Sequence, residues 1–493
     1  MSINDLLIIS PELIIIIFGL SILIIDFFKV RKSLLSIISI LGLIIAILAL
    51  VYQLFSDITI TQSSFLNSSI VFDELGILYK SIIILSAIFV LLASTNFTKS
   101  FDKYTSEFYS LILLSTSGMM FLSSASELIL LYLSIELTTL PLIALCAINK
   151  TNKSAESSMK FLILASISSA ILLYGIVLLY GLTGTTDIQL ITTVLTDLFK
   201  NGDTQNIPIS ILIITLIITG FGFKISAVPF QMWTPDVYEG SPISITAFLS
   251  VASKAAAFAA LIRISTLIFP NLPQEISWGD IIAIISAISM TIGNFSAILQ
   301  NSFKRMMAYS TIAHAGYLLI AIAGISSGVI SDSISTLSFY LIGYSLMNLT
   351  AFLSVMIVLN TNKDDSIKSL SGLGKTSPLI AFCIAISMIA LTGFPPTVGF
   401  IGKLYLFSVG FNAGFTWLIF VALLNSVISA YYYLRVIKVM YFNTPSKTKL
   451  LQSDVVPKFA IVFLSFLIIL LGILPNPIIE ITISAAESIL VLK

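Results

Sequence analysis

The chain has 493 residues, of which 57% are hydrophobic and only 10% are charged, and its mean hydropathy is +1.06. Soluble domains carry about 25% charged residues, so this composition excludes an ordinary soluble protein and indicates a chain that lies in lipid. The formal net charge of +1 and the lack of a basic arm give no indication of a nucleic-acid partner. The only histidine is His314, and Cys146 and Cys383 lie far apart, which predicts no metal site and no structural disulfide.

Apolar runs long enough to cross a bilayer follow one another along the chain, since a membrane helix needs about 20 mainly apolar residues. The first run has no basic segment before it and no cleavage site of small residues, so we expect it to remain as a span. The runs lie at 6–28, 34–54, 74–94, 108–125, 127–148, 160–181, 209–230, 242–269, 279–300, 304–327, 334–360, 378–407, 414–440 and 458–476. They predict an all-α polytopic membrane protein with about fourteen transmembrane helices.

The charged residues between the predicted spans differ in sign from one loop to the next. One set of alternate loops carries most of the bases, among them Lys29, Lys99, Lys150, Lys304, Lys363 and Arg435. The other set carries acidic residues such as Asp57, Asp73, Asp187, Asp280 and Asp332, and its only bases are Lys200 and Lys493. Because basic loops stay in the cytoplasm, this alternation predicts that both termini lie on the opposite, acidic side of the membrane.

Two predicted spans contain a lysine next to a helix-breaking segment. The seventh span ends in KISAVPFQMWTPDVYEGSP, in which Pro229 follows Lys224 by little more than one turn. The twelfth span is interrupted by GFPP, which includes Pro395, and Lys403 follows this break. The two spans are separated by an odd number of crossings, so they enter the membrane from opposite sides. Paired interrupted helices of this kind are typical of an inverted repeat, with two unrelated proline kinks as the alternative.

The order of the spans divides one membrane domain into four consecutive parts. We predict a three-helix segment at 1–107, a first five-helix repeat at 108–269, a second, inverted five-helix repeat at 279–440, and a C-terminal loop with the last span at 441–493. The seventh and twelfth helices are the broken members of the two repeats. No low-complexity linker indicates a separate domain.

Several charged residues fall inside predicted spans, where a charge costs about 2.5–3.5 kcal/mol and must be paired or face water. One is an acid, Glu136, and three are the bases Lys224, Lys254 and Lys403, each on a different span. Intramembrane acids and bases mark proton or ion pathways, so we predict that these four form a chain of protonatable groups near mid-membrane. Arg263 lies nearer the acidic side, and we expect it to extend toward the membrane surface.

Three further polar residues leave two interpretations open. His314 would relay protons between the two repeats, or would be a hydrogen-bonded packing histidine. Asp236 and Glu239, in the loop after the first break, are interpreted as surface residues, with proton entry as the alternative. The chain has no phosphate-binding glycine-rich loop, no dinucleotide fingerprint and no CxxC cluster, so any driving force must come from a partner or an ion gradient.

The segments MWTPDVYEGSP, SIEL, ASKAAAF and TGFPPTVGFIGKLY resemble the antiporter-like subunits of respiratory complex I, the proton-translocating NADH–quinone oxidoreductase. The resemblance covers about spans 4 to 13, and the same family has relatives in multisubunit cation/proton antiporters and membrane-bound hydrogenases. Two of its three homologous branches in complex I typically carry a histidine where this chain has Gln231. That difference, and the DVYEGSP ending, resemble the third branch.

The resemblance implies that quinone reduction elsewhere in the complex alters the pairing of Glu136 with Lys224. Lys224 would then exchange a proton along Lys254 to Lys403, which releases it to the acidic side. No cofactor is implied in this chain, and FMN, Fe–S clusters and quinone are expected in partner subunits. The implied partners are the other membrane subunits of the complex, including the two homologous antiporter-like subunits. The implied location is a bacterial plasma membrane or, alternatively, a mitochondrial inner membrane.

Two other functions are compatible with the same charges. A subunit of a multisubunit Na⁺/H⁺ antiporter would use them for secondary transport, but a cation site needs carboxylates or carbonyls at the midplane, and Glu136 is the only acid predicted there. A packing scaffold would need every charge to be matched, whereas the predicted set has three bases and one acid. We therefore expect a proton-translocating subunit that is catalytic only within an assembled complex.

Overall fold

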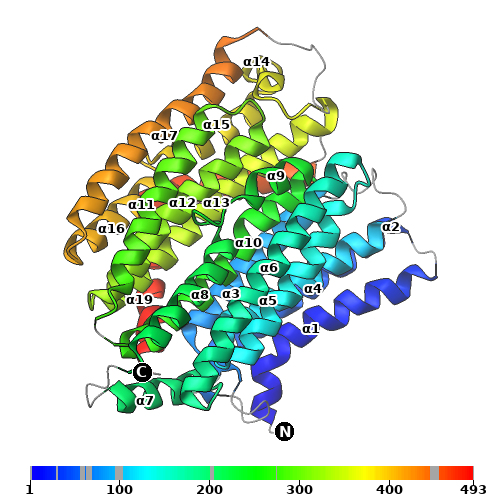
Figure 1. Ribbon diagram of the computed structural model, residues 1–493. Helices are drawn as coiled ribbons and strands as arrows, with labels where there is room; N and C mark the ends of the chain where they lie inside the picture. The colour runs from blue at the N-terminus through cyan, green and yellow to red at the C-terminus, as the bar shows by residue number, and fades with distance from the viewer. Residues whose placement is uncertain are drawn as a thin grey trace.

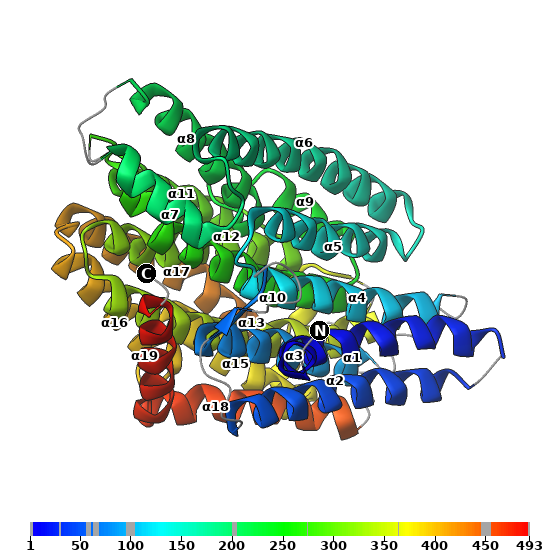
Figure 2. The same cartoon turned by 90° about the horizontal axis from the view of Figure 1, so that it is seen from below.

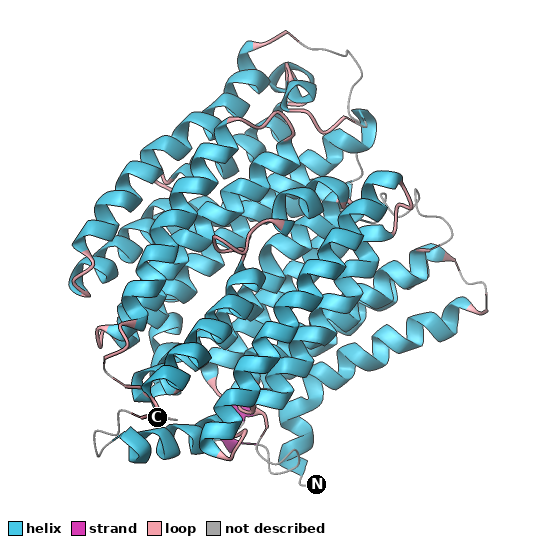
Figure 3. Cartoon of the chain, in the orientation of Figure 1, coloured by secondary structure: helices cyan, strands magenta, loops and turns pink. Residues whose placement is uncertain are grey.

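The computed structural model describes residues 3–28, 31–55, 61–62, 69–94, 104–199, 205–273, 275–362, 364–444 and 455–491. The described part is almost entirely helical (Figure 3), and its strands are the short antiparallel pair β1 (Thr61–Gln62) and β2 (Val71–Phe72). Some loop residues that support the predicted orientation lie outside the described residues, among them Lys29, Asp57, Lys99, Lys200, Lys363 and Lys493. The orientation in the membrane therefore stays a prediction.

The helices run roughly along one direction and form one bundle (Figure 1). In chain order they are α1 (Ile3–Asp26), α2 (Lys32–Phe55), α3 (Glu74–Ser94), α4 (Thr105–Ser124), α5 (Leu128–Ala147), α6 (Asn152–Thr183), α7 (Ile188–Phe199), α8 (Ile207–Ile225), α9 (Trp233–Gly240), α10 (Ile243–Leu267), α11 (Trp278–Ile298), α12 (Phe303–Ser326), α13 (Ile330–Asn362), α14 (Leu373–Thr376), α15 (Pro378–Thr392), α16 (Val398–Asn412), α17 (Thr416–Phe442), α18 (Val455–Ile473) and α19 (Asn476–Leu490). Short 3₁₀ turns lie at Phe269–Asn271 and Ile367–Leu370.

Every predicted span corresponds to a helix or to a broken pair of helices. Among the described helices, twelve are long and apolar enough to cross a membrane. The predicted span 108–125 corresponds to α4, which is less apolar than the twelve. The predicted span 378–407 corresponds to the pair α15 and α16, and both of these helices are short. The predicted all-α polytopic membrane fold is confirmed. Both termini lie at the same end of the bundle (Figure 1), as an even number of crossings requires.

Both predicted breaks are present, and each begins with a left-handed residue. The helix α8 ends at Ile225, and Ser226 follows with φ 64° before the loop that contains Pro229. The helix α15 ends at Thr392, and Gly393 follows with φ 92° before Pro395. Glycine suits position 393 for two reasons. Its φ is positive, and an added Cβ would lie 3.0 Å from the Lys403 side chain. Proline then prevents either helix from continuing unbroken.

The two five-helix sets pack in matching ways. In the first set α4 packs on α5, α6 on α8, and α4 on α10; in the second, α11 packs on α12, α13 on α15, and α11 on α17. Seen from below, α6 and α8 lie on one edge and α2 and α18 on the opposite edge, with α10 and α13 between them (Figure 2). This correspondence agrees with an inverted repeat, and the proposed domain boundaries themselves stay a prediction.

The centre of the bundle consists of α10, α12 and α13. Their apolar segments are 94%, 94% and 89% buried, compared with 39% for α1 and α2, so polar groups on these three helices are shielded from lipid. Four short helices, α7, α9, α14 and α19, do not correspond to any predicted span because they are too short to cross the membrane. They lie in segments that the sequence predicts as loops or as the end of the chain.

Candidate functional site

Two of the predicted lysines bind the free carbonyls at the helix breaks. Lys254, in the middle of α10 and 1% exposed, donates to the carbonyl of Ile225 at 2.9 Å. Lys403, in α16 and 4% exposed, donates to the carbonyl of Thr392 at 2.8 Å. Ile225 and Thr392 are the last residues of α8 and α15, where backbone carbonyls lack a partner within the helix and the helix dipole favours a cation. In both repeats, therefore, a buried lysine binds the last carbonyl of a broken helix.

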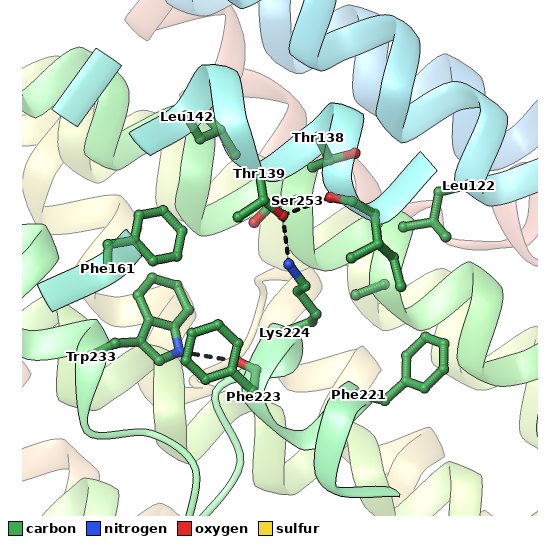
Figure 4. Close-up of a pocket in the computed structure, with 12 residues that line it drawn as sticks. Leu122, Thr138, Thr139, Leu142, Phe161, Phe221, Phe223, Lys224, Trp233 and Ser253 are labelled. Carbon is green, nitrogen blue, oxygen red and sulfur yellow. Dashed lines mark hydrogen bonds between the residues drawn. The ribbon is translucent and has the colours of Figure 1, made fainter. Parts of the chain in front are cut away.

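Lys224 and Glu136 each bind a hydroxyl group instead of one another. Lys224 Nζ donates to Thr139 Oγ1 at 2.5 Å (Figure 4). Ser169 of α6 donates to the Glu136 carboxylate. Both charged side chains are partly buried. Among the contacts of these described side chains, no ion pair joins Glu136 directly to Lys224.

His314 of α12 lies between two tyrosine hydroxyls, one from α13 and one from α17. Its Nδ1 is 2.6 Å from the Tyr340 hydroxyl, and its Nε2 is 3.1 Å from the Tyr433 hydroxyl. Tyr433 also forms a hydrogen bond with Ser310. In the neutral ring one nitrogen carries a hydrogen and the other is an acceptor. One tyrosine hydroxyl therefore accepts a hydrogen bond from the ring, and the other donates one to it.

The central polar groups connect the two repeats. Lys254 Nζ donates at 3.3 Å to the carbonyl of Thr311, which follows Ser310 on α12. On the other side of His314, the Tyr317 ring lies edge-on to the imidazole at 5.7 Å between ring centroids, and the ammonium of Lys403 is 4.9 Å from the same tyrosine ring. Lys403 also donates to Ser426 Oγ at 3.0 Å. The buried groups from Lys254 to Lys403 are therefore neighbours, with hydroxyl and aromatic groups between the bases.

A small cavity lies beside Lys224. Its volume of about 20 Å³ is enough for one water molecule, and Thr139, Ser253 and Trp233 line it together with the lysine (Figure 4). Trp233 closes one side, since its indole stacks on Phe161 at 4.7 Å and donates to the carbonyl of Phe223 at 3.0 Å. Ser253 precedes Lys254 on α10, so this cavity lies between the helices that carry the first two lysines.

The interpretation of Arg263 as a side chain that extends to the membrane surface is wrong. Arg263 is 1% exposed, and its Nη2 forms a 2.7 Å ion pair with Asp73, which is 2% exposed. Its Nε donates to the carbonyl of Ser123 at 3.0 Å. The sequence places Asp73 in a loop, so it gave no indication that this acid lies within reach of α10. Asp73 directly precedes α3 and accepts a hydrogen bond from the Gly76 amide at 2.9 Å.

A second buried ion pair was not predicted from the sequence. Lys80 of α3 is 2.7 Å from Glu12 of α1, and their side chains are 4% and 1% exposed. The signal was present, because each residue is an isolated charge inside a predicted span. Here one acid is matched by one base, as a structural ion pair requires. It lies in the N-terminal segment, outside the five-helix repeats.

Asp236 and Glu239 lie on α9, outside the membrane-spanning helices, and are partly exposed. Asp236 pairs with Lys160 and Arg305 at 2.9 Å each, and Glu239 pairs with Lys153 at 2.9 Å and with Arg305 at 2.8 Å. Partial burial alone would raise the pKa of both carboxyls, but the hydrogen bonds and charges of these bases outweigh it and lower each pKa. The cluster holds α9 against the ends of α6 and α12.

We expect this cluster to stabilise the folded protein at neutral pH and to lose that contribution in acid. Because both folded pKa values are lowered, the contribution is complete above the unfolded values of about 3.9 and 4.3 and disappears as pH falls through the folded values. Each partly exposed pair is worth up to about 1 kcal/mol. The thermal midpoints in detergent of the wild type and of the Asp236→Asn/Glu239→Gln variant should differ near pH 7 and converge near pH 3. A difference independent of pH would contradict this assignment.

Buried lysines that bind the ends of interrupted helices, in two five-helix sets that pack in matching ways, place the chain in the class of membrane transporters built from inverted repeats. Residues 125–429 match the family model described as "NADH:quinone oxidoreductase/Mrp antiporter, TM". The match covers more than half of the sequence, and the chain belongs to this family.

Curated relatives match along nearly the full length of the chain. NADH-quinone oxidoreductase subunit N of Dehalococcoides mccartyi is 37% identical, with 97% of this chain and 99% of the relative covered. F(420)H(2) dehydrogenase subunit N of Methanosarcina mazei is 35% identical over 98% and 99% of the two chains. These names agree with the branch that the DVYEGSP ending and Gln231 indicate.

Solved structures share the fold. A chain of respiratory complex I from Thermus thermophilus, solved with bound aureothin, has a TM-score of 0.79 and 28% identity, covering 95% of this chain and 98% of that chain. A chain of the Mrp complex from Dietzia sp. has a TM-score of 0.83 at 20% identity, with coverage of 99% and 97%. At that identity the second likeness concerns the fold alone.

Proposed function

We propose that this chain is the N-type membrane subunit of a NADH–quinone oxidoreductase and that it translocates protons through Glu136, Lys224, Lys254, His314 and Lys403. The observation that carries the proposal is the continuity of buried polar groups from Lys254 to Lys403 across both repeats. A chain of this kind is costly in a membrane and is not needed for packing. The relatives named as subunit N support the choice of complex.

Each lysine has a partner that can hold an ammonium without neutralising it. Backbone carbonyls at the broken helix ends bind Lys254 and Lys403, and a hydroxyl binds Lys224. Burial disfavours the charged form of a lysine and nearby acceptors favour it, so such a residue can take up and release a proton near physiological pH. His314 would pass a proton by changing which ring nitrogen carries the hydrogen, with a tyrosine hydroxyl on each side.

The redox chemistry belongs to partner subunits in this proposal. An Fe–S cluster needs about four thiolate ligands, whereas the chain has two cysteines, both free and buried in the structure. The residues present therefore do not fit such a cluster. FMN, Fe–S clusters and quinone would be held by other subunits, and the partners would include the two homologous antiporter-like subunits. The chain is a multi-pass membrane protein, and its bacterial relatives support a plasma-membrane location.

The alternative is a subunit of a multisubunit Na⁺/H⁺ antiporter, which the fold likeness to the Mrp chain allows. A Na⁺ site needs several oxygen ligands at the midplane. In the described residues the buried groups along the path are mainly bases, and no group of three or more His, Cys, Asp and Glu residues is placed to hold a cation. Proton transfer therefore explains the geometry better than Na⁺ binding. Proton uptake that persists in the complete absence of Na⁺ would separate the two functions.

The test of the proposed function is Lys224→Ala in the reconstituted complex. We expect the complex to assemble, because the change removes a partly buried charge, and we expect NADH oxidation and proton uptake to fall together. A barrier increase of about 1.4 kcal/mol would already reduce the rate about tenfold. Lys153→Ala, which removes a surface lysine paired with Glu239, is the matched control. Near-normal oxidation and proton uptake in Lys224→Ala would overturn the proposal.

A further inference from the structure

The first charged pair of the path has a third member that the sequence did not single out. Thr139 lies on α5, one turn after Glu136, and its hydroxyl is the hydrogen-bond partner of the Lys224 ammonium at 2.5 Å. Figure 4 shows the lysine side chain extended toward this hydroxyl. Thr139 is 4% exposed, so the ammonium is held at a site that is buried from lipid.

The Thr139 hydroxyl is oriented as an acceptor. Its own hydrogen is donated to the carbonyl of Ile135, one turn back on α5, at 2.6 Å. That bond leaves the oxygen lone pairs free for the ammonium, which has three donors and no acceptor. A valine at this position would keep the same shape and remove the acceptor. The bond to Lys224 therefore depends on the hydroxyl and not on the side-chain volume.

Glu136 and Thr139 offer Lys224 two different partners on one helix face. Residues three apart on a helix are neighbours, so the carboxylate and the hydroxyl lie side by side on α5, and Lys224 has a flexible stem. In this structure Glu136 is bound by Ser169 instead, so both charges are satisfied separately. The water-sized cavity beside Lys224 and Thr139 gives the ammonium space to move away from the hydroxyl.

We propose that Thr139 is a positioning residue that holds Lys224 apart from Glu136, so that the ion pair forms only when the lysine exchanges the hydroxyl for the carboxylate. This inference rests on the proposed function. A hydroxyl binds the ammonium without adding a negative charge, so the proton remains free to leave toward α10. A carboxylate favours the charged form and retains the proton. Thr139 thus sets how readily Lys224 releases its proton.

The test compares Thr139→Val with Thr139→Ser in the assembled complex. In Thr139→Val the lysine should pair with Glu136, and the pH at which proton uptake is half-maximal should rise by about one unit, since an opposite charge shifts proton release by about 1–3 units. Thr139→Ser keeps the acceptor and should match the wild type. A packing role predicts the reverse order, because valine preserves the volume and serine removes a methyl group. That reverse order would overturn the proposal.

Thr138→Val provides the matched control. Thr138 is the adjacent residue, also faces the cavity, and donates to the carbonyl of Ser134 at 2.8 Å. We expect its valine variant to keep the wild-type pH profile; the same shift in both variants would assign the effect to the polarity of the cavity and overturn the role of Thr139. If Thr139→Val does not assemble, Thr139→Ala removes the same acceptor and should show the same shift.

The outcome separates this inference from the function on which it rests. Loss of proton uptake in Lys224→Ala together with a wild-type pH profile in Thr139→Val would overturn the inference and leave the proposed function intact. Normal uptake in Lys224→Ala would overturn the function itself. A profile shift in Thr139→Val that disappears when Glu136→Gln is added is the expected result, because the carboxylate is then no longer available to Lys224. A shift that persists in that double variant would overturn the exchange between the two partners.

Discussion

Replacement of Lys254 by methionine should stop proton transfer between the two repeats while the complex still assembles. Lys254 is the buried base between α8 and α12, and it contacts the carbonyls of Ile225 and Thr311. Without it, a proton that leaves Lys224 has no base to receive it before His314. An unpaired charge at this depth costs about 2.5–3.5 kcal/mol, which corresponds to a loss of roughly 100-fold in rate.

Assembly should be less affected than transport because methionine has similar volume and carries no charge to desolvate. The change leaves two carbonyls without the ammonium, at a cost of about 1–3 kcal/mol for each group left unsatisfied, and removes the desolvation penalty of the lysine. Proton uptake and NADH oxidation per assembled complex are the measurements. Ser250→Ala is the control, since Ser250 is buried one turn away on α10 and donates to the Ala247 carbonyl of its own helix. Transport at the control level in Lys254→Met would contradict the path.

The broken helices explain how lysines are tolerated in the centre of the bundle. An intact helix satisfies its own carbonyls and has nothing to offer an ammonium. A helix that ends within the membrane exposes carbonyl groups and the negative end of its dipole. Lys254 and Lys403 each bind one such end. Lys254 lies on α10, the next long helix after the break at the end of α8. Lys403 lies on α16, the second half of the helix that is broken after α15. The breaks are therefore part of the site and not defects in packing.

The sequence predicted the span order, both breaks and the central bases because each has a strong and rare signal. Lysine is scarce in apolar runs, and proline cannot continue a helical hydrogen-bond ladder, so Lys254 and Pro395 stand out. The comparison with known proteins confirms the family. The roles of the individual site residues stay predictions, since geometry shows proximity and not transfer.

The hydroxyl groups that bind Lys224 and His314 could not be predicted from the sequence in the same way. Serine, threonine and tyrosine are common in these spans, and most of the serines and threonines bond to a carbonyl one turn back in their own helix, as Thr116 does with Ile112. Only the hydrogen bond that Thr139 accepts from Lys224 of α8 distinguishes it from such residues. Tyr433 lies in a run of three tyrosines, and the sequence does not show which of them faces His314.

The buried charges fall into two groups, and only one of them fits a packing scaffold. A scaffold requires matched charges, and two buried pairs, Glu12–Lys80 and Asp73–Arg263, meet that requirement. The Glu12–Lys80 pair joins the N-terminal helices α1 and α3 to each other, and the Asp73–Arg263 pair joins the start of α3 to α10. Lys254 and Lys403 have no acid within their hydrogen bonds in the described residues, so they do not. The paired charges and the lysines of the proposed proton path thus differ in partner type, with carboxylates for the first group and neutral acceptors for the second.

Breaking the Asp73–Arg263 pair should destabilise the subunit more than removing a lysine of the proposed proton path. Removing one partner of a buried ion pair leaves an uncompensated charge and costs about 3–5 kcal/mol. In Asp73→Asn the guanidinium of Arg263 loses its counter-charge and keeps only neutral acceptors such as the Ser123 carbonyl, so we expect a loss of this order. The amount of assembled complex and its midpoint of thermal inactivation are the measurements.

The double variant distinguishes a structural pair from a proton-transfer pair. Arg263→Met combined with Asp73→Asn removes both charges, and a buried ion pair replaced by apolar or neutral groups is often close to neutral in stability. We therefore expect the double variant to recover assembly relative to Asp73→Asn alone and to pump protons normally. Glu136→Gln, which neutralises the carboxylate in α5, should show the opposite combination of normal assembly and weak pumping. Weak pumping by a fully assembled double variant would instead place Asp73 and Arg263 on the proton path.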